Sequence, residues 1–402
     1  MPAELELRID FGSNGNSLGY LGGGWARAEP EFTWAVDEES HLLLQRGPES
    51  AGDCILTLDV IPFTHPPAAP IQRLTLYIGD TVIGTSELLR PSLIGFRVPE
   101  ALAPPGAKIA VTIAHKDAVR PIDIGASKDA RQLAFALREA KLYRLDPLRI
   151  DPAQDALRGM RLGPNGRPHF GPQPATDDAG WVEETTGLTL PQLAMQFESL
   201  GENCEFGLVQ RHWGSEPLGL LRFSSTFLRN LIRGLDGDFE GLGTTEEIEP
   251  RLEGAGAKKE YMIHEKRYGL VYHTFVYEGD RSVWLVREQE TARLKFLRRK
   301  FMEELQVAEK IFVYKRNILV GEDEILPLFL ALRRHGPNTL LWVVPEEPGR
   351  PAGTVEIAMP GILKGYINRF APDDNAHDFD VACWTRICAN AYRLAKLQKP
   401  TA

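Results

Sequence analysis

Cys204 is the residue of this sequence whose surroundings best suit covalent chemistry. It follows an apolar run and a Gly-containing turn over residues 197–203, and the residues after it are helical in type. In the first turn of a helix, unpaired backbone N–H groups and the positive dipole end favour a thiolate. The same N–H groups could stabilise an oxyanion. The pattern predicts a thiol nucleophile, and the alternative is a buried cysteine that only packs a tight turn.

A thiol nucleophile needs a base, usually a histidine, and two of the nine histidines have a suitable context. His273 lies on an apolar, strand-like segment, where it is either a rigidly held base or a hydrogen-bonded core or edge histidine. His377 lies in a Pro- and Asp-rich loop, three residues after Asp374, and could equally belong to a solvated acidic loop. We expect His273 rather than His377 to be the base, because a strand holds a side chain more rigidly than such a loop.

The composition excludes several classes of protein. Lys and Arg total 46 against 55 Asp and Glu, a net charge of -9, which argues against a nucleic-acid binder. Four cysteines are too few for a disulfide framework, and no spacing of Cys and His fits a metal, so neither a metal nor another cofactor is expected. No apolar run approaches the ~20 residues of a membrane span. The first residues lack a signal-peptide pattern, so we expect a cytoplasmic protein of undetermined oligomeric state.

The sequence predicts a multidomain chain. Residues 1–147 read as an all-β sandwich with strands at 54–61, 73–78, 93–98, 108–114 and 132–145, and a hairpin turn at 78–81. Residues 148–190 read as a Pro- and Gly-rich linker. Residues 191–402 read as an α/β domain with a mostly parallel sheet flanked by helices. Its expected strands are 194–200, 268–277, 310–314 and 339–344, and its expected helices are 205–213, 226–234, 291–307, 322–334 and 379–397.

Four blocks in the second half resemble a bacterial family described as papain-like cysteine peptidases. They are the S-L-G-x-N-C signature at 199–204 and the segments 217–223, 268–273 and 295–299, in the family's order. The resemblance covers about residues 195–345. It implies Cys204 as nucleophile and His273 as base, with Asn203 and Arg222 of the matched blocks at the substrate. Thr274 replaces the family's Asp after the histidine, which leaves room for His377 with Asp374.

Two other resemblances concern the same site. A D-x-x-H loop near the C-terminus, following a nucleophile after the first strand, is similar to the layout of GDSL-type esterases, with Cys204 replacing their serine. The turn at 201–204 is also similar in style to a capsule-biosynthesis acetyltransferase family with a G-N-C turn. Arg298 and Arg299 lie on a basic amphipathic segment that is either a solvated helix face or a pocket rim for a phosphate or acidic sugar.

The first domain resembles β-sandwich modules found beside bacterial cell-surface glycan enzymes. Residues 24–34 match their G-W-x-x-x-E-x-x-x-x-W opening, and residues 123–133 resemble their closing G-x-S-x-D-x-R-x-L. Trp25 and Trp34 could stack on sugar rings, although core packing is the more common role of such aromatics.

These patterns favour a thiol-dependent acyl-transfer enzyme, either a hydrolase or an acyltransferase. The resemblances place it in bacterial cell-surface polysaccharide metabolism, with a glycan or an acylated precursor as substrate. The alternatives are a non-catalytic glycan-binding or scaffolding protein, and a glycosyltransferase-associated protein whose Arg298 and Arg299 bind a nucleotide sugar.

Overall fold

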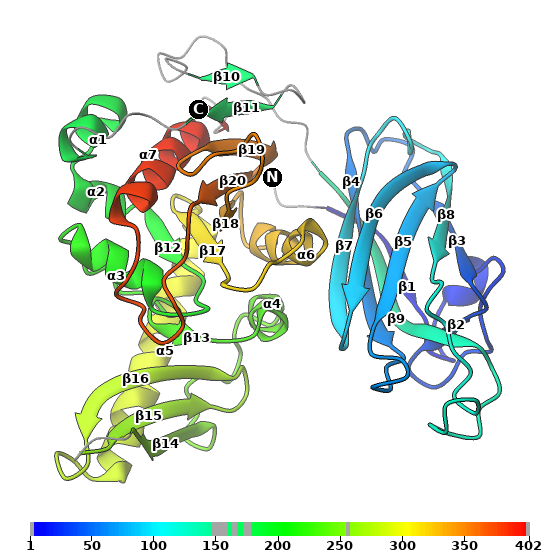
Figure 1. Cartoon of the computed structure of the whole chain (residues 1–402), viewed down its shortest axis with the longest axis horizontal. Coiled ribbons are helices and arrows are strands. Elements are labelled where there is room, and N and C mark those ends of the chain that lie inside the picture. The colour runs from blue at the N-terminus through cyan, green and yellow to red at the C-terminus, as the bar shows by residue number, and fades with distance from the viewer. Residues whose placement is uncertain (1–3, 146–159, 163–166, 172–177, 255–257, 399–402) are drawn as a thin grey trace. The chain divides into compact units, whose positions relative to one another are not determined.

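The computed structural model describes residues 4–145, 160–162, 167–171, 178–254 and 258–398. The chain divides into two compact units (Figure 1). The N-terminal unit contains residues 3–147 together with residues 321–330, and the C-terminal unit contains residues 148–320 and 331–402.

The N-terminal unit is built from two antiparallel sheets. The first has the order β1-β9-β4-β7, with β2 also paired to β9, and the second has the order β3-β8-β5-β6. The strands are β1 (Glu4–Asp10), β2 (Thr33–Val36), β3 (Glu39–Gln45), β4 (Cys54–Pro62), β5 (Gln72–Ile78), β6 (Thr81–Leu88), β7 (Ser92–Val98), β8 (Lys108–Ala114) and β9 (Leu133–Arg144); a short 3-10 helix, η1, covers Ser17–Gly19.

Alternating side chains of both sheets form one core. In β5 every second residue from Gln72 to Ile78 is buried, as expected for a strand with one face inward. Leu58 and Phe135 of the first sheet and Leu74 and Val111 of the second belong to a single apolar cluster. The expectation of a β-rich N-terminal region is confirmed, because all five predicted strands are present. The predicted hairpin joins β5 to β6, where Ile78 pairs with Thr81.

The C-terminal unit contains a seven-stranded sheet of order β10-β11-β19-β20-β18-β17-β12. Its strands are β10 (Arg161–Leu162), β11 (Pro168–Phe170), β12 (Phe197–Ser199), β17 (Ile311–Lys315), β18 (Thr339–Pro345), β19 (Val355–Met359) and β20 (Ile362–Ile367). Strands β12, β17, β18 and β20 are mutually parallel, whereas β10, β11 and β19 pair antiparallel.

The mixed sheet corrects the prediction of a mostly parallel one. Met359 of β19 pairs with Ile362 of β20, so only Pro360 and Gly361 separate the two strands. Parallel neighbours need a connection of a dozen or more residues, and a turn this short can only make an antiparallel hairpin. The Pro-Gly pair was the sequence signal for that turn.

A separate four-stranded antiparallel sheet has the order β13-β16-β15-β14. One of its faces packs on the helix α5 (Val283–Val307), because the Tyr272 hydroxyl of β16 donates a hydrogen bond to Glu290 of that helix at 3.0 Å. His273 lies on β16, so it belongs to this sheet and not to the seven-stranded one. The strands are β13 (Ser224–Ser225), β14 (Ile248–Glu253), β15 (Glu260–Glu265) and β16 (Leu270–Tyr277).

The helices of the second half are α1 (Asp178–Thr186), α2 (Leu190–Ala194), α3 (Glu205–His212), α4 (Leu228–Asp236), α5 (Val283–Val307), α6 (Glu322–Arg333) and α7 (Val381–Gln398). Residues of α1, α2, α3 and α7 share one apolar core with the seven-stranded sheet. Helix α5 begins at Val283, eight residues before the predicted start, and the Ser282 side chain caps it.

The described part of residues 148–190 is not an irregular linker. It contains β10, β11 and α1, and it supplies fully buried Phe170 and Val182 to the core of the C-terminal unit. Each apolar run there is only one or two residues long, so no periodicity marked these elements in the sequence. The predicted strand 194–200 is also shorter, because Ala194 ends α2 and the strand begins at Phe197.

Candidate functional site

Cys204 lies in a tight turn between β12 and α3, at the carboxyl end of a parallel strand. Gly201 has φ +89° and Glu202 has φ +83°, the left-handed region that a side chain rarely adopts. A Cβ on Gly201 would lie 3.1 Å from the Ser224 carbonyl oxygen, so glycine permits this close approach. Cys204 is the N-cap residue of α3. Ligands of open α/β sheets bind at this edge.

The Cys204 thiol is partly buried, and its sulfur lies 3.8 Å from the Phe223 carbonyl oxygen. Burial raises the pKa of the thiol, and the opposing effects of Arg211 and Lys315 are smaller. The expectation of a lowered pKa at the helix N-terminus is therefore corrected: desolvation of the sulfur outweighs the nearby positive charge, and Cys204 rests as a neutral thiol. The other three cysteines are fully buried, so only Cys204 offers a thiol to a reagent.

A buried ion pair lies directly beside the cysteine. The Lys315 ammonium group at the end of β17 lies 2.6 Å from Glu205 Oε2, and the two side chains are 2% and 0% exposed. The indole Nε1 of Trp384 donates to Glu205 Oε1 at 2.9 Å. Burial lowers the pKa of Lys315, and Glu205 acts against that shift. Three elements, α3, β17 and α7, are thus joined at one carboxylate.

The network continues into the loop between β20 and α7. Lys315 Nζ also donates to Asn317 Oδ1 at 2.8 Å, and Asn317 Nδ2 donates to the Ala371 carbonyl oxygen at 2.9 Å and to Asp373 at 2.6 Å. Because β20 is parallel to β18, this loop starts at the same sheet edge as the Cys204 turn. The hydrogen bonds hold the start of the loop against the end of β17.

A second charged pair lies at this edge. Arg316 Nε is 3.5 Å from Glu202 Oε2, and the Arg316 side chain is only 10% exposed. Burial raises the pKa of Glu202, with Arg316 and Lys315 acting in the opposite direction. The edge therefore carries two adjacent cations, Lys315 and Arg316, each facing a glutamate of the Cys204 turn.

The structure separates the two predicted bases. His273 is half exposed on β16, where its Nδ1 lies 3.0 Å from Glu260 Oε2 and its ring stacks on Phe275 at 5.7 Å. His377 is exposed in the loop after β20, and its backbone N–H donates to Asn375 Oδ1 at 3.3 Å. Within the described residues, no hydrogen bond joins either imidazole to Cys204.

The predicted Asp374–His377 pair is not formed in this structure. Both residues are exposed, and across the described ranges neither side chain hydrogen-bonds to the other. The loop that carries them is nevertheless attached to α3, because the rings of His212 and Phe379 pack edge to face with centroids 6.2 Å apart. Figure 1 shows this loop running beside α3.

Arg222, which the sequence predicted to bind substrate, is engaged by the protein itself in this structure. Its guanidinium group is almost fully buried and lies 2.6 Å from Glu216. It also donates to the carbonyl oxygens of Pro217, Gly207 and Ser215 at 2.9–3.2 Å. These hydrogen bonds join the segment 215–217 to Gly207 of α3.

The other predicted binding residues are also engaged by the protein. Asn203 Oδ1 accepts a hydrogen bond from the Glu205 N–H at 3.0 Å, so this side chain stabilises the first turn of α3. Arg298 Nε donates to the Asp238 carbonyl oxygen at 2.8 Å. Arg299 is exposed and lies over the Phe296 ring, 3.8 Å from Glu303. Both arginines lie on α5, and no contact between either of them and Cys204 is present among the described residues.

Sequence reasoning missed Glu205, Lys315 and Trp384. Two of them had a signal: Glu205 follows Cys204 directly, and Lys315 follows the predicted strand 310–314, where a ligand site is expected. Trp384 is an apolar position of the last helix and had no such signal.

In the parts of the chain that the structure describes, no group of three or more His, Cys, Asp or Glu residues could hold a metal ion. No described helix is long and apolar enough to span a membrane.

The two tryptophans of the N-terminal unit have different surroundings. Trp25 packs against Phe11 and Phe135, with ring centroids 5.6 and 6.1 Å apart, and its Nε1 donates to a backbone oxygen at 2.8 Å. Trp34 lies on the other side of β2, since its neighbours Thr33 and Ala35 are buried. It is half buried and makes edge contacts with Phe32 and Phe63 at 5.7 and 6.2 Å. Trp25 is therefore partly buried and packed against the core, and Trp34 is partly buried on the other side of β2.

Comparisons with known proteins concern the N-terminal region. No family model matches the sequence, and no curated protein matches it. The fold resembles the C-terminal CBM6 of LamC, a marine laminarinase from Zobellia galactanivorans, at 13% identity and a TM-score of 0.22 over 34% of this chain and 98% of that one. It also resembles a CBM36 module solved with calcium and xylotriose, at 9% identity and a TM-score of 0.21 over 34% and 98% of the two chains.

A third similar structure is TmCBM27, a mannan-recognising carbohydrate-binding module, at 12% identity and a TM-score of 0.24 over 36% of this chain and 100% of that one. At these identities and TM-scores, the likeness does not indicate what this chain binds. The resemblance of residues 195–345 to papain-like peptidases has no counterpart among the family models.

Proposed function

We propose that the C-terminal unit is a thiol-dependent acyl-transfer enzyme, a hydrolase or an acyltransferase, with Cys204 as its nucleophile. The observation that carries this proposal is the position of the thiol. Cys204 is the one cysteine of four that is not fully buried, and it caps a helix at the carboxyl edge of the parallel strands, in a turn with left-handed Glu202. The acyl group or its acceptor belongs to a cell-surface polysaccharide or its precursor.

The raised pKa of Cys204 favours general-base catalysis over a preformed thiolate. The base takes the thiol proton while sulfur bonds to the acyl carbon, and the carbonyl oxygen becomes an oxyanion near the first N–H groups of α3. The oxyanion collapses, the bond to the leaving group breaks, and the base returns its proton to that group. Water or an acceptor hydroxyl then takes the acyl group from the thioester and restores the thiol.

We take His377 rather than His273 as the base. Its loop starts at the sheet edge of Cys204, is held there by Asn317, and contacts α3 through Phe379. His273 instead pairs with Glu260 on a different sheet. In this proposal the exposed loop moves when substrate binds and brings His377 within one water of the thiol, since catalytic contacts often tighten only in the complex.

The test measures the release of p-nitrophenolate from p-nitrophenyl acetate by the full chain. Cys204→Ser should abolish the initial burst, and His377→Gln should slow acylation about 100-fold or more, the size of a general-base effect. The matched variant His273→Gln should acylate like the unchanged protein. Acylation that survives Cys204→Ser would contradict the assigned nucleophile. A loss seen with His273→Gln, and not with His377→Gln, would contradict the assigned base.

A second candidate function is glycan binding by the N-terminal unit, and Trp34 favours it. This ring is partly exposed and lies between Phe32 and Phe63, on the side of β2 that faces away from the core. Aromatic rings with an open surface offer a large apolar contact at small entropic cost. Affinity electrophoresis in gels containing a β-glucan, a xylan or a mannan tests the idea. Trp34→Ala should remove any retardation, whereas Trp284→Ala, which alters an exposed tryptophan of the other unit, should not.

A further inference from the structure

Arg316 is a nearly buried arginine whose hydrogen-bond donors are not satisfied by the protein. It follows β17 directly, and its side chain is only 10% exposed. Its Nε is buried without a hydrogen-bond partner, and the facing Glu202 Oε2 lies 3.5 Å away, beyond the usual range of about 2.7–3.2 Å. Within the described residues, neither Nη group donates a hydrogen bond either. Buried polar groups normally have partners, so this guanidinium group lacks acceptors that a ligand could provide.

The adjacent cation does not offer free donors in the same way. Lys315 Nζ lies 2.6 Å from Glu205 and donates to Asn317 at 2.8 Å, and it lies 5.0 Å from the centre of the Phe370 ring. These contacts occupy the ammonium group. Of the two neighbouring cations at this edge, Arg316 is therefore the one that can bind a further anion.

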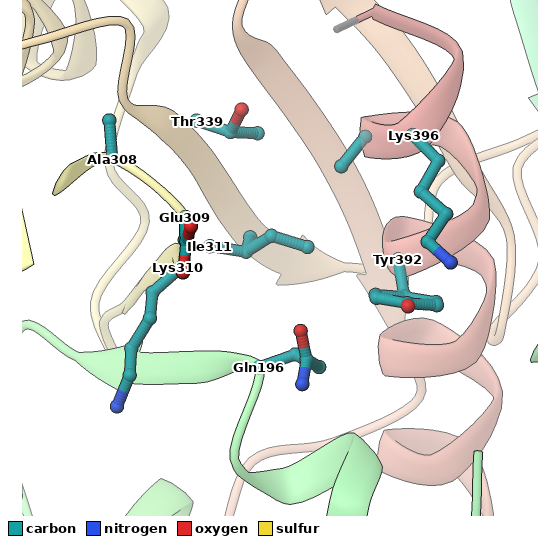
Figure 2. A pocket seen from close by; sticks show the side chains of 9 residues that line it. Gln196, Ala308, Glu309, Lys310, Ile311, Thr339, Tyr392 and Lys396 are labelled. Carbon is teal, nitrogen blue, oxygen red and sulfur yellow. The ribbon is translucent and has the colours of Figure 1, made fainter.

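A cavity at the opposite, amino edge of the parallel strands has no comparable group. It has a volume of about 240 Å³, and Lys310 and Lys396 are among the residues that line it (Figure 2). The Lys310 ammonium group lies 2.8 Å from Glu304 and points away from the cavity, whereas Lys396 is exposed. Neither lysine is a buried cation that lacks acceptors, which distinguishes this cavity from the position of Arg316.

Arg316 lies beside the turn that carries Cys204. Strands β12 and β17 are paired in parallel, so their carboxyl ends lie next to each other. Lys315 contacts Glu205, the residue after Cys204, and Arg316 faces Glu202, two residues before it. The guanidinium group and the thiol therefore flank the same short turn, and a ligand bound by Arg316 lies at the edge where the proposed nucleophile acts.

We propose that Arg316 binds a carboxylate group of the substrate, so that the acyl donor or acceptor at Cys204 is an acidic sugar. The two free Nη groups lie in one plane and match the two oxygens of a carboxylate. A phosphate dianion fits less well, because Glu202 and Asp373 already bring negative charge to this edge. The role in catalysis rests on the acyl-transfer proposal, whereas the binding step needs only Arg316.

Isothermal titration calorimetry of the full chain carrying Cys204→Ser tests the binding step without turnover. The probe is D-glucuronate, and its neutral match is D-glucuronamide, which carries an amide in place of the carboxylate. D-glucose 6-phosphate carries a phosphate at the same carbon. Glucuronate should bind saturably and more tightly than either of the other two. Arg316→Gln should weaken glucuronate binding about tenfold or more, the size of a hydrogen bond to a charged group.

Three further variants sharpen the test. Arg316→Lys keeps the charge but not the planar pair of donors, and should weaken glucuronate binding about threefold or more even if Arg316→Gln does not fold. Glu202→Gln removes the competing carboxylate and should strengthen the binding. Arg251→Gln removes an exposed arginine from β14 and should leave the affinity unchanged.

The proposal is overturned if glucuronate does not bind saturably, or if the Arg316 variants bind it as the parent does. Equal or tighter binding of glucuronamide or glucose 6-phosphate would overturn the assignment of a carboxylate. These results are independent of the p-nitrophenyl acetate burst. A missing burst with intact, Arg316-dependent glucuronate binding would contradict the acyl-transfer proposal and leave the carboxylate site standing.

Discussion

Removing the ammonium group of Lys315 is the substitution with the largest expected effect at the Cys204 edge. Lys315→Met keeps most of the side-chain volume but leaves the Glu205 carboxylate buried, with the Trp384 indole as its remaining donor. Breaking one partner of a buried pair typically costs about 3–5 kcal/mol. The pair here is fully buried with a separation of 2.6 Å, so no discount for solvent screening applies, and a loss near the lower end of this range is expected at pH 7.

The size of the loss has a ceiling that depends on pH. The orphaned carboxylate can take up a proton, and for a glutamate of reference pKa ~4.3 this costs about 3.7 kcal/mol at pH 7 and about 1.6 kcal/mol at pH 5.5. In the variant the folded state binds this proton more tightly than the unfolded state does. Its deficit in stability should therefore shrink as the pH falls.

Urea unfolding followed by circular dichroism, at pH 7 and pH 5.5, measures both values. Lys258→Met is the matched control, because Lys258 lies 3.8 Å from Asp280 at an exposed site and should contribute less than about 1 kcal/mol. The double variant with Glu205→Gln should recover most of the loss. A deficit below about 1 kcal/mol at pH 7, or one that stays constant at pH 5.5, would refute the reasoning about the buried pair.

Three further outcomes follow from the surroundings of single residues. Burial raises the pKa of the Cys204 thiol, so the pH profile of its alkylation by iodoacetamide, followed by mass spectrometry, should have its midpoint above the free-thiol value of pH ~8.5; a midpoint at or below pH ~8.5 would contradict this. Burial raises the pKa of Glu198 to about 7. The contribution of this group to stability is therefore complete below its pKa in the unfolded state, and it is lost as the pH rises towards 7. The unfolding free energy of Glu198→Gln, measured in urea, should lack the corresponding dependence on pH, which is up to about 1.4 kcal/mol per pH unit. Arg222→Gln should lower the unfolding free energy by about 2–4 kcal/mol, because Glu216 and three carbonyl oxygens lose a buried donor. A loss under about 0.5 kcal/mol would contradict the structural role assigned to these Arg222 contacts.

Local patterns predicted the elements that place Cys204, but not the groups around it. The apolar run before Gly201 and the helical residues after it gave β12 and α3 to within a few residues, because strand and helix periodicity are local properties. The partners of Glu205 are 110 and 179 residues away along the chain. Tertiary packing brings them together, and no spacing in the sequence encodes that.

The same dependence on tertiary packing explains why the sequence did not show which sheet carries His273. His273 was correctly expected on a strand, yet its sheet is determined by pairing with β13 and β15, whose short or polar runs gave no strand signal. In the N-terminal unit, alternation predicted the strands, and the burial of Thr33 and Ala35 decided that Trp34 faces outward. The raised pKa of Cys204 depends on how deeply its sulfur is buried, which the helix N-terminus alone could not indicate.

The most direct test of the acyl-transfer proposal is to trap and locate the acyl group. The protein is mixed with p-nitrophenyl acetate, quenched in acid during the burst, digested and mapped by mass spectrometry. The account predicts one acetyl group on the peptide containing Cys204, released by hydroxylamine as expected for a thioester, and absent from Cys204→Ser. An acetyl group found only on lysine or serine side chains, or an unmodified Cys204 throughout turnover, would contradict it.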